Sequence, residues 1–152
     1  RSAGHFSKAF AGRTARKVPA EKALDYVYGY TMCWDISIRD PWGKGRHNTR
    51  NIRKGFDTFC PIGEPGRVPN DLSSLTVVTR VNGAERQRGA AAEMIFSIPD
   101  LLAYVSNVMT LEPDDIVATG TPAGVGILQP GDEVEVEIVG ISRVKNPVRA
   151  RV

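Results

Sequence analysis

The chain has 152 residues, of which 41% are hydrophobic and 24% charged, and its formal net charge is +3. These values are typical of one soluble globular domain that is large enough to bury a hydrophobic core. No apolar run reaches the roughly 20 residues of a membrane span, and no signal peptide is visible. We therefore expect a cytoplasmic protein that does not contact a membrane. Because the first residue is Arg1 rather than Met, we also expect the natural start to lie upstream, which leaves targeting open.

The first half of the chain predicts a short helix followed by a strand. Residues 1–12 show no clean periodicity, and no element is predicted there. Pro19 suits the first position of a helix, and Ala23, Tyr26 and Val27 follow at helical spacing, so a helix is expected that ends at Gly29. The run 30–38 is rich in aromatic and branched residues, which predicts a strand. The polar run 39–53 that follows is a long loop, and long loops are often functional.

The second half predicts a hairpin, a helix and several short strands. Alternation over 75–81 indicates a strand, and Asn82-Gly83 predicts a type I′ turn into a return strand over 84–88. Apolar spacing over 98–109 predicts a helix with Ser97 as its N-cap. Shorter strands are expected at 115–119 and 133–139, with a last edge strand at 144–152. The irregular order excludes a repeating βαβ fold and predicts a β-rich α+β domain with two or three short helices.

Two cysteines, Cys33 and Cys60, lie far apart in the sequence and match no metal-ligand spacing. We expect both to be buried thiols in a reducing cytosol.

The densest basic cluster lies between Lys44 and Lys54. No known nucleic-acid-binding motif accompanies it, so we expect no nucleic-acid partner. A basic loop that closes over an acidic small molecule fits the same residues. We expect the loop from Pro41 to Arg53 to be mobile without ligand and to lie near the mouth of the site, with His47 as either a solvated residue or an acid/base.

Three segments carry residues that suit chemistry. Asp35 interrupts an apolar strand, where a carboxylate is costly unless it is paired or bound to a metal. A salt bridge to Arg39 and metal ligation remain alternatives. Lys54 lies beside Gly55 and Phe56, where it is either a surface lysine or a partly desolvated cation for a carboxylate or enolate. A strand runs into Thr119-Gly120-Thr121, which is either a structural turn or a carboxylate cradle.

Together these segments resemble the catalytic C-terminal domain of the fumarylacetoacetate hydrolase family, which includes 2-hydroxyhepta-2,4-diene-1,7-dioate isomerases, acylpyruvate hydrolases and oxaloacetate decarboxylases. The resemblance runs from about Gly12 to the end, and its most specific part is Thr119-Gly120-Thr121-Pro122 with Gly124-Val125-Gly126. The other matching segments are Gly29-Tyr30 with Asp35, Ser37, Arg39 and Asp40; Lys54 with Asp57-Thr58-Phe59 and Pro61-Ile62-Gly63; Val81-Asn82-Gly83 with Gln87; Met94-Ile95-Phe96; and Leu111-Glu112-Pro113 with Asp115.

The resemblance implies a fold and a set of roles. The fold is a mixed β-roll in a single catalytic domain over 1–152, and the assembly is a homodimer. Asp35 resembles a metal ligand for Mg²⁺, with Mn²⁺ or Ca²⁺ as substitutes. Lys54 and Arg39 resemble catalytic residues, and Thr119, Gly120 and Thr121 resemble substrate-binding residues. The implied metabolic role is aromatic catabolism. The implied reaction converts small 2-oxo acids through an enolate, by C–C bond hydrolysis or tautomerisation.

The sequence also departs from the family. Gly4 and Phe6 occupy the positions of a Glu-x-Glu pair that would complete the metal site, and neither can bind a metal. Either the chain belongs to a longer protein that supplies the rest, or it is a metal-free half with a structural or dimerisation role. An oxaloacetate-type decarboxylase is a further alternative. Without a metal, Asp35 is expected within hydrogen-bond reach of Arg39, Lys54 or an ordered water.

Overall fold

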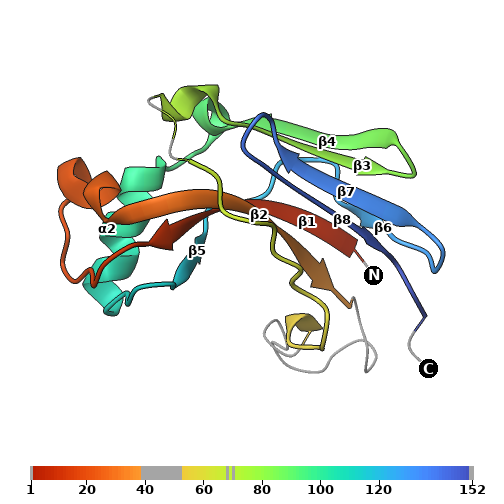
Figure 1. Ribbon diagram of the computed structural model, residues 1–152, viewed down its shortest axis with the longest axis horizontal. Coiled ribbons are helices and arrows are strands. Elements are labelled where there is room, and N and C mark those ends of the chain that lie inside the picture. Colours follow the sequence, from red (N-terminus) through yellow and green to blue (C-terminus); the bar gives the residue numbers. More distant parts are fainter. Residues whose placement is uncertain (1, 39–52, 68, 70, 151–152) are drawn as a thin grey trace.

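The computed structural model describes residues 2–38, 53–67, 69 and 71–150, with residues 2–10 as backbone only. Two antiparallel sheets form the molecule (Figure 1). In the first sheet, β1 (Ser2–Ala11) lies between β2 (Val27–Ser37) and β5 (Ile116–Ala118), and it also pairs with β6 (Gly126–Ile127). The second sheet has the order β4 (Ala84–Ala90), β3 (Thr76–Val81), β7 (Glu133–Ile138) and β8 (Ser142–Pro147).

The core lies where β2 packs against β7 and β8. Tyr30, Met32 and Trp34 are fully buried on β2, and they share this core with Val134 and Val136 of β7. The helix α2 (Ile98–Val108) packs beside the 3₁₀ helix η1 (Ala20–Tyr26) at the end of the molecule away from both termini (Figure 1). Two shorter 3₁₀ turns, η2 (Leu72–Ser74) and η3 (Ala91–Glu93), flank the hairpin.

The predicted β-rich α+β class is confirmed, and so are several of its local features. Asn82 and Gly83 have φ of 52° and 81°, as a type I′ turn requires. The Ser97 hydroxyl accepts a hydrogen bond from the Asp100 N–H at 3.3 Å, which is the predicted cap of α2. The last strand, β8, does lie at a sheet edge.

Two local predictions were wrong. Residues 2–11, for which no element was expected, form the strand β1. This strand pairs with β2 on one side and with β5 and β6 on the other. Pairing on both sides outweighs a sequence without strand periodicity. The helix expected after Pro19 is a 3₁₀ helix, and Pro19 is its cap rather than its first residue.

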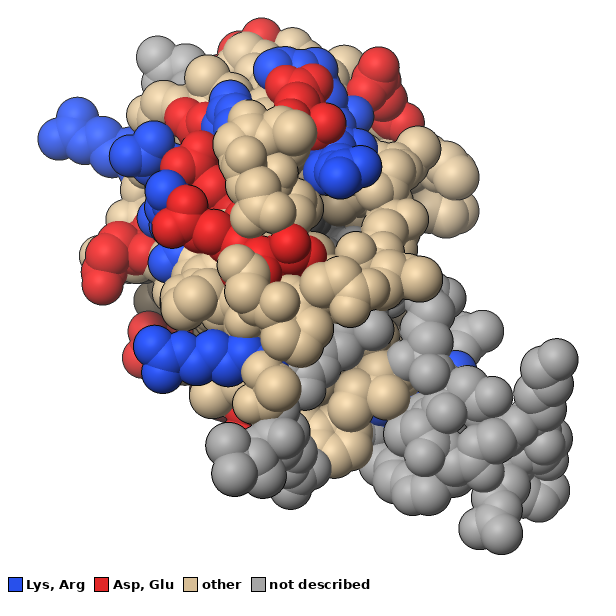
Figure 2. Space-filling view, turned by 90° about the vertical axis from the view of Figure 1, so that its right-hand side faces the viewer, with Lys and Arg blue, Asp and Glu red and all other residues tan. Residues whose placement is uncertain are grey.

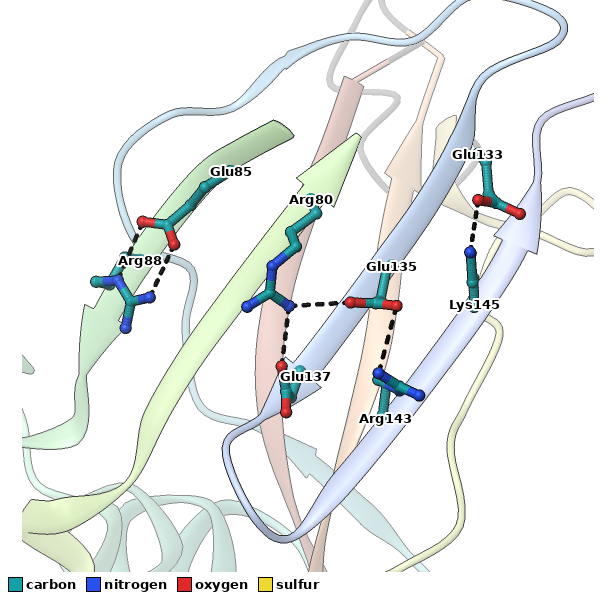
Figure 3. Close-up of polar contacts among 8 residues, drawn as sticks. All are labelled: Arg80, Glu85, Arg88, Glu133, Glu135, Glu137, Arg143 and Lys145. Carbon is teal, nitrogen blue, oxygen red and sulfur yellow. Dashed lines mark hydrogen bonds and ion pairs between the residues drawn. The ribbon is translucent and has the colours of Figure 1, made fainter. Parts of the chain in front are cut away.

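Ion pairs cover the outer face of the second sheet. Glu135 and Glu137 of β7 each accept a hydrogen bond from Arg80 at 2.9 Å, and Arg143 lies 3.6 Å from Glu135 (Figure 3). Lys145 pairs with Glu133 at 2.6 Å. On the described part of the face in Figure 2, acidic and basic side chains lie interspersed.

Among the described residues, the structure has no helix that is long and apolar enough to cross a membrane. Residues 39–52, which form most of the predicted basic loop and include Arg39 and His47, lie outside the described residues.

Candidate active site

Asp35 and Lys54 form an ion pair at the end of β2. The Lys54 ammonium donates a hydrogen bond to Asp35 Oδ2. The Asp35 side chain is 20% exposed and that of Lys54 is 45% exposed, so the pair lies at a solvent-accessible surface. This contact is one of those expected in the absence of a metal, and it is confirmed. Arg39, the other expected partner, is outside the described residues.

Two neighbouring segments flank Asp35 in the sheet. On one side, Ile36 N–H donates to Phe59 O at 3.1 Å and Trp34 N–H donates to Pro61 O at 3.1 Å. These two bonds place Cys60 directly opposite Asp35. On the other side, Asp35 lies opposite Gly4 of β1. Opposed residues on antiparallel strands point to the same face, so this face of β2 presents Asp35 between positions 60 and 4.

The same register tests whether the chain can hold the expected divalent metal. Gly4 lies opposite Asp35 and Phe6 opposite Cys33, so positions 4 and 6 share the Asp35 face. Neither residue has an oxygen ligand in its side chain. Among the described residues there is no group of three His, Cys, Asp or Glu side chains arranged to hold a metal. One carboxylate already paired with an ammonium does not fit a metal centre that needs several oxygen ligands.

The Thr119-Gly120-Thr121 turn follows β5, so β1 separates it from Asp35 on β2. Thr119 is 8% exposed, and Gly120 has φ of 138°, a conformation that residues with a Cβ rarely adopt. The turn lines a pocket of about 540 Å³ together with Met94 and Phe96. Asp35 and Lys54 do not line this pocket, so the structure joins those two residues and places the turn about two strand spacings away.

Gln87 is a residue of this region whose role the sequence did not reveal. It is the one buried residue of β4, at 3% exposed. Its Nε2 donates to Pro122 O at 2.8 Å and to Ala123 O at 3.2 Å, and thereby fixes the segment that follows the turn. A Cβ at Gly124 would lie 2.2 Å from Arg86 O, so β4 and this segment are in direct backbone contact. The sequence did offer one signal for this role, which is a polar residue at an inward-facing position of the predicted hairpin.

The chain matches the family model described as "Fumarylacetoacetate (FAA) hydrolase C-terminal" over residues 9–149, and it therefore belongs to that family. It is 45% identical over 141 residues to the 4-hydroxyphenylacetate degradation bifunctional isomerase/decarboxylase of Salmonella dublin, covering 90% of this chain and 32% of that protein. The sequence-based recognition of the family is thus confirmed.

Solved structures agree with this assignment. The 5-carboxymethyl-2-hydroxymuconate delta-isomerase of Mycobacterium smegmatis has a TM-score of 0.86 at 35% identity, over 99% of this chain and 59% of that one. A maleylpyruvate hydrolase from Sphingobium, solved with manganese(II) and pyruvate, has a TM-score of 0.85 at 33% identity, over 97% and 54% of the two chains. The chain also spans 64% of the length of a relative from Pyrococcus abyssi that is 49% identical over 144 residues and 91% of this chain.

Proposed function

We propose that the chain is the catalytic part of an enzyme that acts on small 2-oxo diacids through an enolate, by C–C bond hydrolysis or tautomerisation. The observation that carries the proposal is the Asp35–Lys54 pair at one side of β1 with the Thr119-Gly120-Thr121 turn at the other. Two strand spacings amount to about 10 Å, which suits an extended diacid with one end at each place.

Lys54 would supply the positive charge for the reacting end of the substrate. Its ammonium is held by Asp35, and the Lys54 side chain remains 45% exposed, which suits contact with a bound oxyanion. A fixed cation stabilises an enolate oxygen more than the neutral ketone from which the enolate forms, and this difference lowers the barrier. Arg39 is proposed as a second cation that orients the substrate.

The turn would bind the distal carboxylate. Backbone N–H groups in a Gly-containing turn and the two threonine hydroxyls are suitable donors for a carboxylate. Most residues that line the neighbouring pocket are apolar, although Arg88 and Glu93 line it too, and Met94 and Phe96 would contact the carbon chain of the substrate.

The metal dependence expected from the family is not part of this mechanism. A manganese complex is known for the Sphingobium maleylpyruvate hydrolase, but positions 4 and 6 of this chain hold Gly and Phe. Binding of Mg²⁺ or Mn²⁺ would require oxygen ligands from residues other than those at positions 4 and 6.

Two alternatives are favoured by specific observations. The chain is 38% identical over 136 residues to a mitochondrial oxaloacetate decarboxylase of Dictyostelium discoideum, and decarboxylation passes through an enolate too. The lack of ligands at positions 4 and 6 favours a non-catalytic half with a structural role.

The test is a panel of acylpyruvates, hydroxymuconate-type diacids and oxaloacetate, assayed with the full-length protein in the presence and absence of Mg²⁺ or Mn²⁺. Turnover of a 2-oxo diacid supports the proposal, and the substrate preference separates hydrolase, isomerase and decarboxylase. If no compound is turned over under either condition, the enzymatic proposal is wrong and the structural alternative stands.

A further inference from the structure

Cys33 and Cys60 form a close thiol pair beside the candidate site. The two sulfur atoms are 3.4 Å apart, and neither cysteine is in a disulfide. Cys33 lies on β2 opposite Ile62, and Cys60 lies opposite Asp35, so the two cysteines are diagonal neighbours on one face of adjacent extended segments. The sequence-based expectation that both thiols are buried was wrong for Cys60, which is exposed.

The two thiols differ sharply in accessibility. Cys33 is 1% exposed, so a reagent in solution does not reach its sulfur without local opening. Cys60 is open to solvent, and its sulfur lies within hydrogen-bond distance of Cys33. Thiol–disulfide exchange requires access to the attacking sulfur and then a second thiol close to the mixed disulfide. The pair therefore has one accessible cysteine and one buried resolving cysteine.

We propose that Cys33 and Cys60 are a redox-modification site, which a low-molecular-weight disulfide such as oxidised glutathione converts to an intramolecular disulfide. The Cys60 sulfur attacks the reagent, forms a mixed disulfide and releases one thiol, which takes the Cys60 proton. The Cys33 sulfur then attacks the Cys60 sulfur, forms the Cys33–Cys60 bond and releases the second thiol with the Cys33 proton. The reagent disulfide is reduced to two thiols, and the protein pair is oxidised.

The geometry favours the second step over a lasting mixed disulfide. Bond formation needs the sulfurs to approach from 3.4 Å to about 2 Å, which side-chain rotation and a small backbone shift supply. The bond would tie β2 to the segment that holds Cys60, directly next to Asp35. Any effect on turnover rests on the proposed function, whereas the thiol chemistry does not.

The experiment treats the reduced protein with oxidised glutathione under native conditions and maps the products by mass spectrometry of non-reduced digests. The wild type should lose two hydrogens and yield one peptide pair that joins Cys33 to Cys60. Cys33→Ser should instead keep a glutathione adduct on Cys60, because the resolving thiol is gone. Cys60→Ser should stay unmodified, since Cys33 is inaccessible. The oxidised wild type should melt roughly 5 °C or more above the reduced form.

Two results would overturn the proposal: a stable glutathione adduct on wild-type Cys60 without the crosslink, or modification of Cys33 in Cys60→Ser at the wild-type rate. A measurement on the wild type alone covers the case in which a variant does not fold. Brief alkylation of the native reduced protein should label Cys60 at least tenfold faster than Cys33, and equal labelling counts against the proposal.

Discussion

Asp35 of β2 lies directly opposite Gly4 of β1, in a register that also sets Phe6 opposite Cys33. Carboxylates at positions 4 and 6 would thus share a face with Asp35 and complete a set of three oxygen ligands. We predict that Gly4→Glu/Phe6→Glu binds Mn²⁺ at least tenfold more tightly than the wild type, as measured by isothermal titration calorimetry.

The control for this prediction is the triple variant that also carries Asp35→Asn. It should lose most of the gained affinity, because one charged ligand is replaced by a neutral one. Equal Mn²⁺ affinity of the double variant and the wild type would show that the three positions do not form one site.

Gln87 gives a second prediction, which concerns the placement of the Thr119-Gly120-Thr121 turn that is proposed to bind the substrate. Gln87→Leu removes the donor that pairs with Pro122 O and Ala123 O and leaves two carbonyls unpaired near the turn. Pro122 is half-buried and Ala123 is exposed, so water can replace part of the lost donor, and the free energy of unfolding should fall by about 0.5–1.5 kcal/mol in a denaturant titration. KM for a diacid substrate should rise more than kcat falls, because the distal carboxylate loses its aligned donors.

The matched control is Gln129→Leu, the same substitution at an exposed position whose backbone N–H, not its side chain, bonds to Asp132. It should change neither the unfolding free energy nor KM appreciably. If the two variants behave alike, Gln87 does not position the turn.

The hairpin and α2 could be predicted from the sequence because local chemistry specifies them. Asn82-Gly83 tolerates positive φ at both residues, and Ser97 caps the helix whatever lies around it. The strand β1 could not be predicted, because its conformation comes from partners that are distant in sequence on both sides. The family's motif residues named Asp35 and Lys54 as candidates for the site, and the structure pairs these two side chains.

The spatial arrangement of the candidate site residues was harder to predict than their identity. The 19-residue separation of Asp35 and Lys54 does not reveal a contact, which depends on how the intervening chain returns to β2. Cys60 is exposed because it lies on the segment that pairs with the outer side of β2. No pattern in residues 59–63 predicts this pairing. Gln87 was noticed only as a motif residue, and its role depends on the packing of β4 against the segment after the turn.

Tyr30 provides a prediction for stability and pH. Its hydroxyl is buried and has no hydrogen-bond partner in the described structure, and burial raises the pKa of Tyr30 from 10.0 to about 12. As the pH rises, Tyr30 therefore ionises in the unfolded chain before it ionises in the folded protein. The contribution of Tyr30 to the free energy of unfolding is complete below pH 10 and is lost as the pH rises towards 12. Tyr30→Phe should remove this part of the alkaline decline, and at pH 7 it should be neutral or stabilising by up to about 1 kcal/mol.

Urea titrations at pH 7 and between pH 10 and 11 measure this effect, with Tyr104→Phe as the control, because Tyr104 is 70% exposed on α2. A loss of more than about 1 kcal/mol in Tyr30→Phe at pH 7 would mean that the hydroxyl has a stabilising partner.

The last prediction tests Lys54 in the mechanism. Lys54→Met keeps most of the stem volume and removes the charge proposed to face the enolate oxygen. Loss of one preorganised electrostatic contact to a developing oxyanion typically lowers the rate by about 10²–10³-fold, so kcat/KM should fall by that factor. The melting temperature should change by only about 2 °C, because a partly exposed ion pair contributes little to stability.

Lys145→Met is the matched control: Lys145 is 52% exposed and pairs with Glu133 at 2.6 Å on the second sheet, so it resembles Lys54 in exposure and pairing but not in location. Both variants should melt alike while only Lys54→Met loses turnover. Near-wild-type kcat/KM in Lys54→Met with an unchanged melting temperature would remove Lys54 from the mechanism, since the ion pair with Asp35 would then be structural, like that of Lys145.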